Sequence, residues 1–73
     1  MVNNGEEYVW QFEVANDVQR RDNGRVYFEL RANERAAELG CHLVGLKNVH
    51  LDFLRGRWKV TGTAILEKMK ATG

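Results

Sequence analysis

The sequence has no proline and no serine, and it contains one cysteine and two histidines. A single cysteine excludes an internal disulfide, and no pair of cysteines stands at the spacing of a zinc site. A chain of 73 residues buries only about 60% of the surface that its unfolded form exposes. Because neither a disulfide nor a structural metal reinforces so small a core, we expect subunits to associate.

Long apolar runs and an excess of charge of one sign are also missing. The longest apolar run is far too short to span a bilayer, so we expect no membrane partner. Residues 1–7 are polar and acidic and lack the features of a signal peptide, which together with the single cysteine predicts a cytoplasmic protein. Eleven Lys and Arg residues against ten Asp and Glu residues give a net charge of +1, so nucleic-acid binding would need a local basic patch.

Residue types that carry catalysis or bind metals are few and scattered. The threonines stand in no catalytic motif, and no glycine-rich segment has the spacing of a phosphate-binding loop. Cys41, His42 and His50 match no zinc motif. We expect Cys41 to be a small buried side chain and His50 to lie on a polar face beside Asp52. The sequence therefore predicts no enzyme, no cofactor and no metal site.

The first half of the chain alternates between apolar and polar residues. No repeat or linker interrupts residues 1–73, so we expect one domain with loose ends at 1–7 and 70–73. The alternation over residues 8–31 has the period of a β-strand. A three-residue loop at 22–24 would place Gly24 in the left-handed region and keep the apolar residues on one face. We therefore expect a β-hairpin here.

A helix is expected after this hairpin. Residues 33–40 begin with Asn33, a residue type that caps helices, and end with Gly40, which is typical of a helix stop. The alternative is one longer helix over residues 25–39. We favour the hairpin because the residues from Val26 to Phe28 are better strand formers than helix formers. The stripe of the alternative helix is Phe28, Ala32, Ala36 and Leu39.

The second half of the chain also reads as a hairpin. Apolar residues alternate on both sides of Arg55-Gly56, which predicts a two-residue turn there. The apolar phase slips near residues 45–48, which predicts a β-bulge. The expected class is α+β, with a small antiparallel sheet of two β-hairpins and one short helix between them, in the order β-β-α-β-β. The facing pairs in this hairpin are Phe53–Trp58, Leu51–Val60 and Val49–Gly62.

Residues 8–13 are left without a partner by the first hairpin. Either the strand at 61–67 pairs with them in the same subunit, or they cross to a neighbouring chain. We favour the crossing, since the short helix is too small to cover an aromatic sheet face. A second subunit would supply the missing layer.

Basic residues gather at the two expected hairpin tips. Together with an aromatic residue on the same strand they could neutralise and stack single-stranded nucleic acid, although arginines also protect strand edges in small β-proteins. The candidate binding residues are Arg20, Arg21, Arg25, Tyr27, Arg55, Arg57 and Lys59.

Three function classes follow from these features. The first is a non-catalytic, homo-oligomeric binding or interaction module, whose partner is a second copy of the chain. The second is a small protein that binds nucleic acid through the hairpin-tip arginines. An acidic protein is another partner that these arginines could bind. The third is a small-ligand sensor or carrier, which no specific residue of the sequence supports.

Three short segments also resemble a known family. The segments are Glu34–Cys41, Val44–Leu46 and Thr61–Leu66. They are similar to the helix-to-strand junction and last strand of the YbjQ type of small bacterial heavy-metal-binding proteins, which form rings. The resemblance covers less than half of the chain. Because the expected N-terminal hairpin departs from that family's longer helix, we carry over neither its metal binding nor its ring size.

Overall fold

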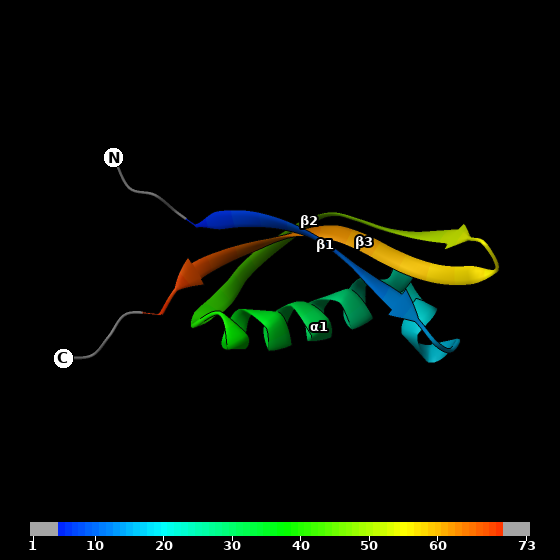
Figure 1. The fold of residues 1–73 in the computed structure, drawn as a ribbon, viewed down its shortest axis with the longest axis horizontal. Coiled ribbons are helices and arrows are strands. Elements are labelled where there is room, and N and C mark those ends of the chain that lie inside the picture. Colours follow the sequence, from blue (N-terminus) through cyan, green and yellow to red (C-terminus); the bar gives the residue numbers. More distant parts are fainter. Residues whose placement is uncertain (1–4, 70–73) are drawn as a thin grey trace.

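The computed structural model describes residues 5–69 as one antiparallel sheet with one α-helix against it (Figure 1). Its elements follow one another as β1 (Glu6–Val14), η1 (Val18–Gly24), α1 (Arg25–Glu38), β2 (Cys41–Leu54) and β3 (Arg57–Lys68), where η1 is a short 3-10 segment. The strand order across the sheet is β1-β3-β2. The α+β class is confirmed, and the expected β-β-α-β-β order is wrong.

The central strand of the sheet is β3. Its antiparallel ladder with β1 runs without interruption from Glu6 opposite Leu66 to Val14 opposite Trp58. The segment that we expected to cross to a neighbouring chain therefore pairs inside its own chain. Glu6 and Glu7 lie in β1, although we expected residues 1–7 to form a loose end. Residues 1–4 and 70–73 lie outside the described residues.

The first expected hairpin is wrong, and of its expected loop only the conformation of Gly24 is right. Asp22, Asn23 and Gly24 all have left-handed backbone conformations, with φ of 54°, 56° and 78°. Three such residues in succession redirect the chain, and the next residue begins α1 instead of a returning strand. The left-handed conformation expected for Gly24 is confirmed. The residues after it are helical, as in the alternative that we did not favour.

Burial along α1 explains why the helix forms. Phe28, Ala32 and Ala36 are spaced four residues apart and are all buried, which is the pattern of one helix face. A strand would have buried Val26 and Leu30 together with Phe28, but these side chains are 64% and 56% exposed. Four-residue spacing therefore prevails over two-residue alternation in this segment.

The C-terminal end of α1 is where we expected it, and the N-terminal end is not. The helix stops at Glu38, and Gly40 follows with a left-handed φ of 73°. Its N–H donates to the Ala37 carbonyl at 3.2 Å, as in a typical glycine stop. The expected helix end at Gly40 is confirmed. Asn33, expected as the first capping residue, lies within the helix, and its Nδ2 donates to the Glu29 carbonyl at 3.0 Å.

The second expected hairpin is present between β2 and β3. Phe53 faces Trp58 and Leu51 faces Val60, as predicted. Both turn residues are left-handed, with φ of 53° at Arg55 and 77° at Gly56, which is the conformation of a type I′ turn. The predicted bulge is confirmed by two shifts of register, between Leu43 and Gly45 and between Lys47 and His50. The expected pair of Val49 with Gly62 falls within the second shift.

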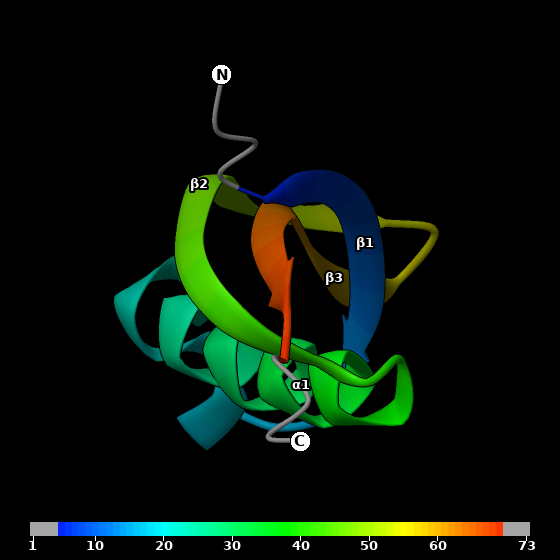
Figure 2. The same ribbon diagram turned by 90° about the vertical axis from the view of Figure 1, so that its left-hand side faces the viewer.

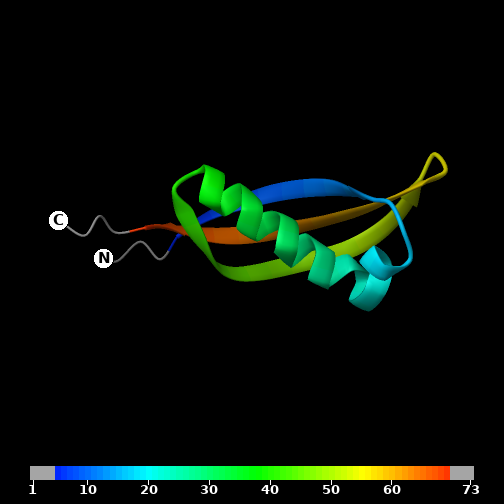
Figure 3. The same cartoon turned by 90° about the horizontal axis from the view of Figure 1, so that it is seen from below.

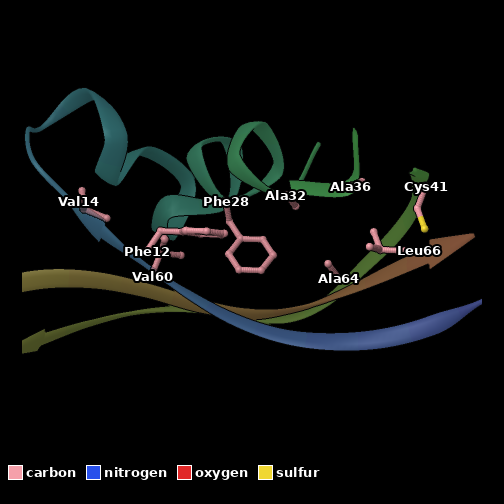
Figure 4. Close-up of a cluster of buried hydrophobic side chains, with 9 residues drawn as sticks. All are labelled: Phe12, Val14, Phe28, Ala32, Ala36, Cys41, Val60, Ala64 and Leu66. Carbon is pink, nitrogen blue, oxygen red and sulfur yellow. The ribbon is translucent and has the colours of Figure 1, made fainter. Parts of the chain in front are cut away.

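The core lies between α1 and the inner face of the sheet (Figure 4). Its centre is Phe28, whose ring packs over Gly62 of β3. A Cβ atom on Gly62 would lie 3.1 Å from Phe28 Cζ and 2.8 Å from Val49 Cγ2, so only glycine allows this approach. The buried apolar side chains are Phe12, Val14, Phe28, Ala32, Ala36, Cys41, Val60, Ala64 and Leu66.

The helix covers only part of the inner face (Figures 2 and 3). It runs obliquely beneath the sheet, and the turn between β2 and β3 extends beyond it (Figure 1). Near that turn Phe53 is 55% exposed. On β1, Tyr8 and Trp10 face inward but are only half-buried. Apolar side chains thus remain accessible at the hairpin tip and along β1.

Gly24 and Gly56 provide a matched test of this packing. Their φ angles are nearly equal, 78° and 77°, but a Cβ on Gly24 would lie 2.9 Å from Val60 Cγ2, whereas one on Gly56 would meet nothing within 4 Å. Gly56→Ala should lower the unfolding free energy by about 1–2 kcal/mol, and Gly24→Ala by about 2–4 kcal/mol because overpacking is added. Thermal denaturation measures both, and equal melting temperatures would contradict the contact between Gly24 and β3.

Candidate functional site

The outer face of the sheet is mostly polar, and its charged and amide side chains pair with one another. Lys47 of β2 reaches Glu7 of β1, with Nζ 2.7 Å from Oε2, so an ion pair joins the two edge strands above β3. Other contacts on this face include Gln11–Thr61 at 3.1 Å, His50–Asp52 at 3.0 Å and Arg57–Glu13 at 2.9 Å. Because most of its charged groups already have partners, this face offers few groups for catalysis or ligand binding.

The candidate basic residues lie on several elements, and some of them have carboxylate or aromatic neighbours. Arg20 lies in η1, pairs with Asp17, and places its guanidinium carbon 5.1 Å from the centre of the Trp58 ring. Its side chain is two-thirds buried. Trp58 in turn contacts Phe53, with ring centres 4.8 Å apart. Arg20 therefore packs η1 against the β2–β3 hairpin, so its contacts contribute to the stability of the fold.

Arg57 and Lys59 lie on the outer face of β3, away from Arg20. Arg57 is paired with Glu13, with Nη1 2.9 Å from Oε2. Lys59 stands between Glu13 on β1 and Asp52 on β2 in the two ladders. Carboxylates thus flank both cations, which lowers their attraction for phosphate groups.

The remaining candidates are spread over three elements. Arg21 lies in η1, Arg25 begins α1, and Arg55 is in the turn between β2 and β3. No residue in 5–69 forms an ion pair with any of the three. Tyr27 was expected on a strand face beside Arg25, but it lies on α1 and is half-buried. Of the basic candidates, Arg21, Arg25 and Arg55 are therefore the ones that could meet an anionic partner without first giving up an ion pair.

The residues considered for metal binding are placed as expected for structural side chains. Cys41 is buried at the start of β2, and His50 faces Asp52 on the outer face. His42 lies 3.4 Å from Glu67, on the same face. Within the described part of the chain, no three His, Cys, Asp or Glu side chains are grouped so that they could hold a metal ion.

An apolar hollow on the far side of α1 was missed in the sequence. It has a volume of about 190 Å³ and is open to solvent. Its apolar walls come from η1 and from the helix face opposite the sheet. A helical reading of residues 25–38 would have revealed it, because it turns Val26 and Leu30 away from the buried stripe. The lining residues are Val18, Gln19, Val26, Tyr27 and Leu30.

A row of aromatic rings follows the inner face of β1. Ring centres lie 5.5 Å apart for Tyr8 and Trp10, and 6.2 Å apart for Trp10 and Phe12. Arg31 and Arg35 of α1 lie over the Phe12 ring at 5.3 Å and 5.9 Å. The helix thus contacts β1 through these two guanidinium groups and through Phe28, whose ring centre lies 5.4 Å from that of Phe12, while the first two rings of the row are only half-buried.

The described part of the chain contains no helix of the length and apolarity that crossing a membrane requires. No protein-family model, no curated protein and no solved structure matches the chain. The similarity to the YbjQ type is therefore limited to short segments, and the functional argument depends on the surfaces described above.

The placement of Arg20 can be tested against its neighbour Arg21. Arg20→Ala removes a cation–π contact and an ion pair, which together contribute about 1 kcal/mol. We expect the melting temperature to fall by about 4–8 °C. Arg21→Ala, which removes an exposed side chain from the same segment, should leave it nearly unchanged. Equal melting temperatures of the two variants in circular dichroism would contradict the contact of Arg20 with Trp58.

Proposed function

We propose that the protein is a self-associating, non-catalytic interaction module. The observation that supports this is the balance of buried and exposed apolar side chains in residues 5–69. The core has nine buried apolar residues, but these include three alanines and a cysteine. A further nine large apolar side chains are exposed, namely Val9, Val18, Val26, Leu30, Leu39, Val44, Phe53, Leu54 and Met69.

The energetic argument favours association. Fully burying one Val, Leu or Phe side chain stabilises a protein by roughly 1.5–3 kcal/mol. A domain has a net stability of only about 5–15 kcal/mol, so covering a few of these residues in a second subunit is a large gain. This reason for association differs from the one drawn from the sequence, which expected Phe28 on the sheet face that a second subunit would cover. In the structure Phe28 belongs to α1 and itself covers the sheet.

The arrangement of polar groups supports a non-catalytic role. On the outer face, ion pairs and one amide–hydroxyl hydrogen bond already engage carboxylate, amide and imidazole side chains, between strands or, for His50 and Asp52, within β2. Acid–base catalysis needs such groups to face a reacting substrate in a cleft. The function that the geometry supports best is therefore recognition between protein surfaces.

Light scattering at micromolar concentration tests the self-association. We expect a mass of at least twice the 8.4 kDa of one chain, and dilution should lower both this mass and the melting temperature, because assembly stabilises the fold. A stable monomer of 8.4 kDa whose melting temperature does not depend on concentration would contradict the proposal.

Nucleic-acid binding remains the principal alternative, and it would use Arg21, Arg25 and Arg55. We expect no saturable binding of single-stranded or duplex oligonucleotides at low salt, since these arginines lie on separate elements. Fluorescence anisotropy measures this. Binding whose salt slope falls by about one unit in Arg55→Ala and is unchanged in Arg57→Ala, the ion-paired control, would favour the alternative.

The small-ligand alternative has less support from the described residues. Ligand pockets usually enclose roughly 300–1,000 Å³. The hollow beside Gly5 and Leu66 has about 280 Å³ and the one at Val26 and Leu30 about 190 Å³, and both are open to solvent. A single subunit therefore offers little enclosure for a small molecule.

A further inference from the structure

The outer edge of β1 has no strand beside it within the described residues. The strand is nine residues long, and its only neighbour in the sheet is β3. In an antiparallel ladder the N–H and C=O groups of every second residue point away from the existing partner. This row of groups is a template for another strand.

The two edges of the sheet differ in how they are protected. The edge formed by β2 has two register shifts, a left-handed Asn48 and the cation Lys47. Bulges and lysines are devices that prevent pairing at a strand edge. The edge formed by β1 has an unbroken ladder and contains no lysine, arginine or proline. Only β1 is regular enough to accept a second strand.

We propose that β1 pairs antiparallel with β1 of a second copy about a two-fold axis at Val9. The two three-stranded sheets then form one continuous sheet. This inference rests on the proposed self-association and names the surface that carries it. Val9 is the most exposed of the large apolar residues, at 72%, and the axis places it opposite its own copy.

Charge selects this register over the one centred on Trp10. An axis at Trp10 would place Glu7 opposite Glu13 of the second copy, and like charges directly opposite destabilise a sheet. An axis at Val9 places Glu7 opposite Gln11 instead. Glu7 also keeps its ion pair with Lys47 on the outer face.

Burial selects this register over the one centred on Gln11. That axis would place Trp10 opposite Phe12 and Tyr8 opposite Val14, so the half-buried rings would face residues that the subunit already buries. An axis at Val9 brings Tyr8 of each copy opposite Trp10 of the other, and both residues are only half-buried in the subunit. The four rings would form one cluster on the inner face of the joined sheet. The register at Val9 therefore covers the apolar surface that one subunit leaves open.

A charge at the axis tests the interface. Val9→Lys places two lysines opposite each other, whereas Val44→Lys adds the same charge to an exposed position on β2 at the protected edge. We expect Val9→Lys to halve the mass or to raise the dissociation constant by about tenfold or more. Val44→Lys should leave the mass unchanged. Light scattering over a dilution series measures both variants.

A covalent test does not depend on weakening the assembly. Facing residues in an antiparallel pair have Cα atoms about 4.5–5.5 Å apart, which lies within the range that disulfides span. In a Cys41→Ala background, mild oxidation should link Val9→Cys into a covalent dimer on a non-reducing gel. Val44→Cys should give none at the same concentration.

The outcomes separate this inference from the function on which it rests. A monomeric wild type would overturn both. An associated wild type, with an unchanged mass in Val9→Lys and no covalent dimer in Val9→Cys, would overturn the pairing of β1 and leave self-association in place. Should Val9→Lys fail to fold, as judged by circular dichroism, the disulfide of Val9→Cys alone decides between these results.

Discussion

The contact between Phe28 and Gly62 is the constraint on which the rest of the structure depends. Phe28 is completely buried, and its ring occupies the space that a side chain at Gly62 would need. This brings α1 close to the central strand. At the next two turns of the helix the buried residues are Ala32 and Ala36, and small side chains maintain the same close approach. One aromatic ring and one glycine thus set the spacing between the two layers.

What the molecule leaves exposed follows from the same packing. A single helix held under the centre of a three-stranded sheet cannot reach every apolar side chain on the inner face. On β1 the helix contacts Phe12 through Phe28, Arg31 and Arg35. Tyr8 and Trp10 remain half-buried. Turning Phe28 inward also turns Val26 and Leu30 outward. The apolar surface is therefore a consequence of the core, and it supports association as the way to complete the fold.

The error in the first half of the chain has a definite physical origin. Apolar residues at every second position also occupy every fourth position, so Phe28, Ala32 and Ala36 satisfy the period of a strand and the spacing of a helix at once. The β-propensity of Val26 and Tyr27 favoured the strand. Propensity is a weak preference that tertiary packing overrides. Only the helical arrangement buries Phe28, Ala32 and Ala36 together against the sheet.

Backbone preferences of single residues could be read from the sequence, and long-range pairing could not. The left-handed conformation of Gly24, the helix stop at Gly40, the Arg55-Gly56 turn and the bulge near residues 45–48 were all predicted, because each depends on local chain chemistry. Cys41 and His50 also lie where their residue types suggested. The tertiary structure alone decided that β3 is central, that β1 pairs within the chain, and which basic residues have carboxylate partners. Those outcomes depend on the course of the chain between β1 and α1. There Gly24 packs against Val60 of β3, which is distant in sequence. Contacts between such distant residues produce no pattern in the neighbouring sequence from which they could be predicted.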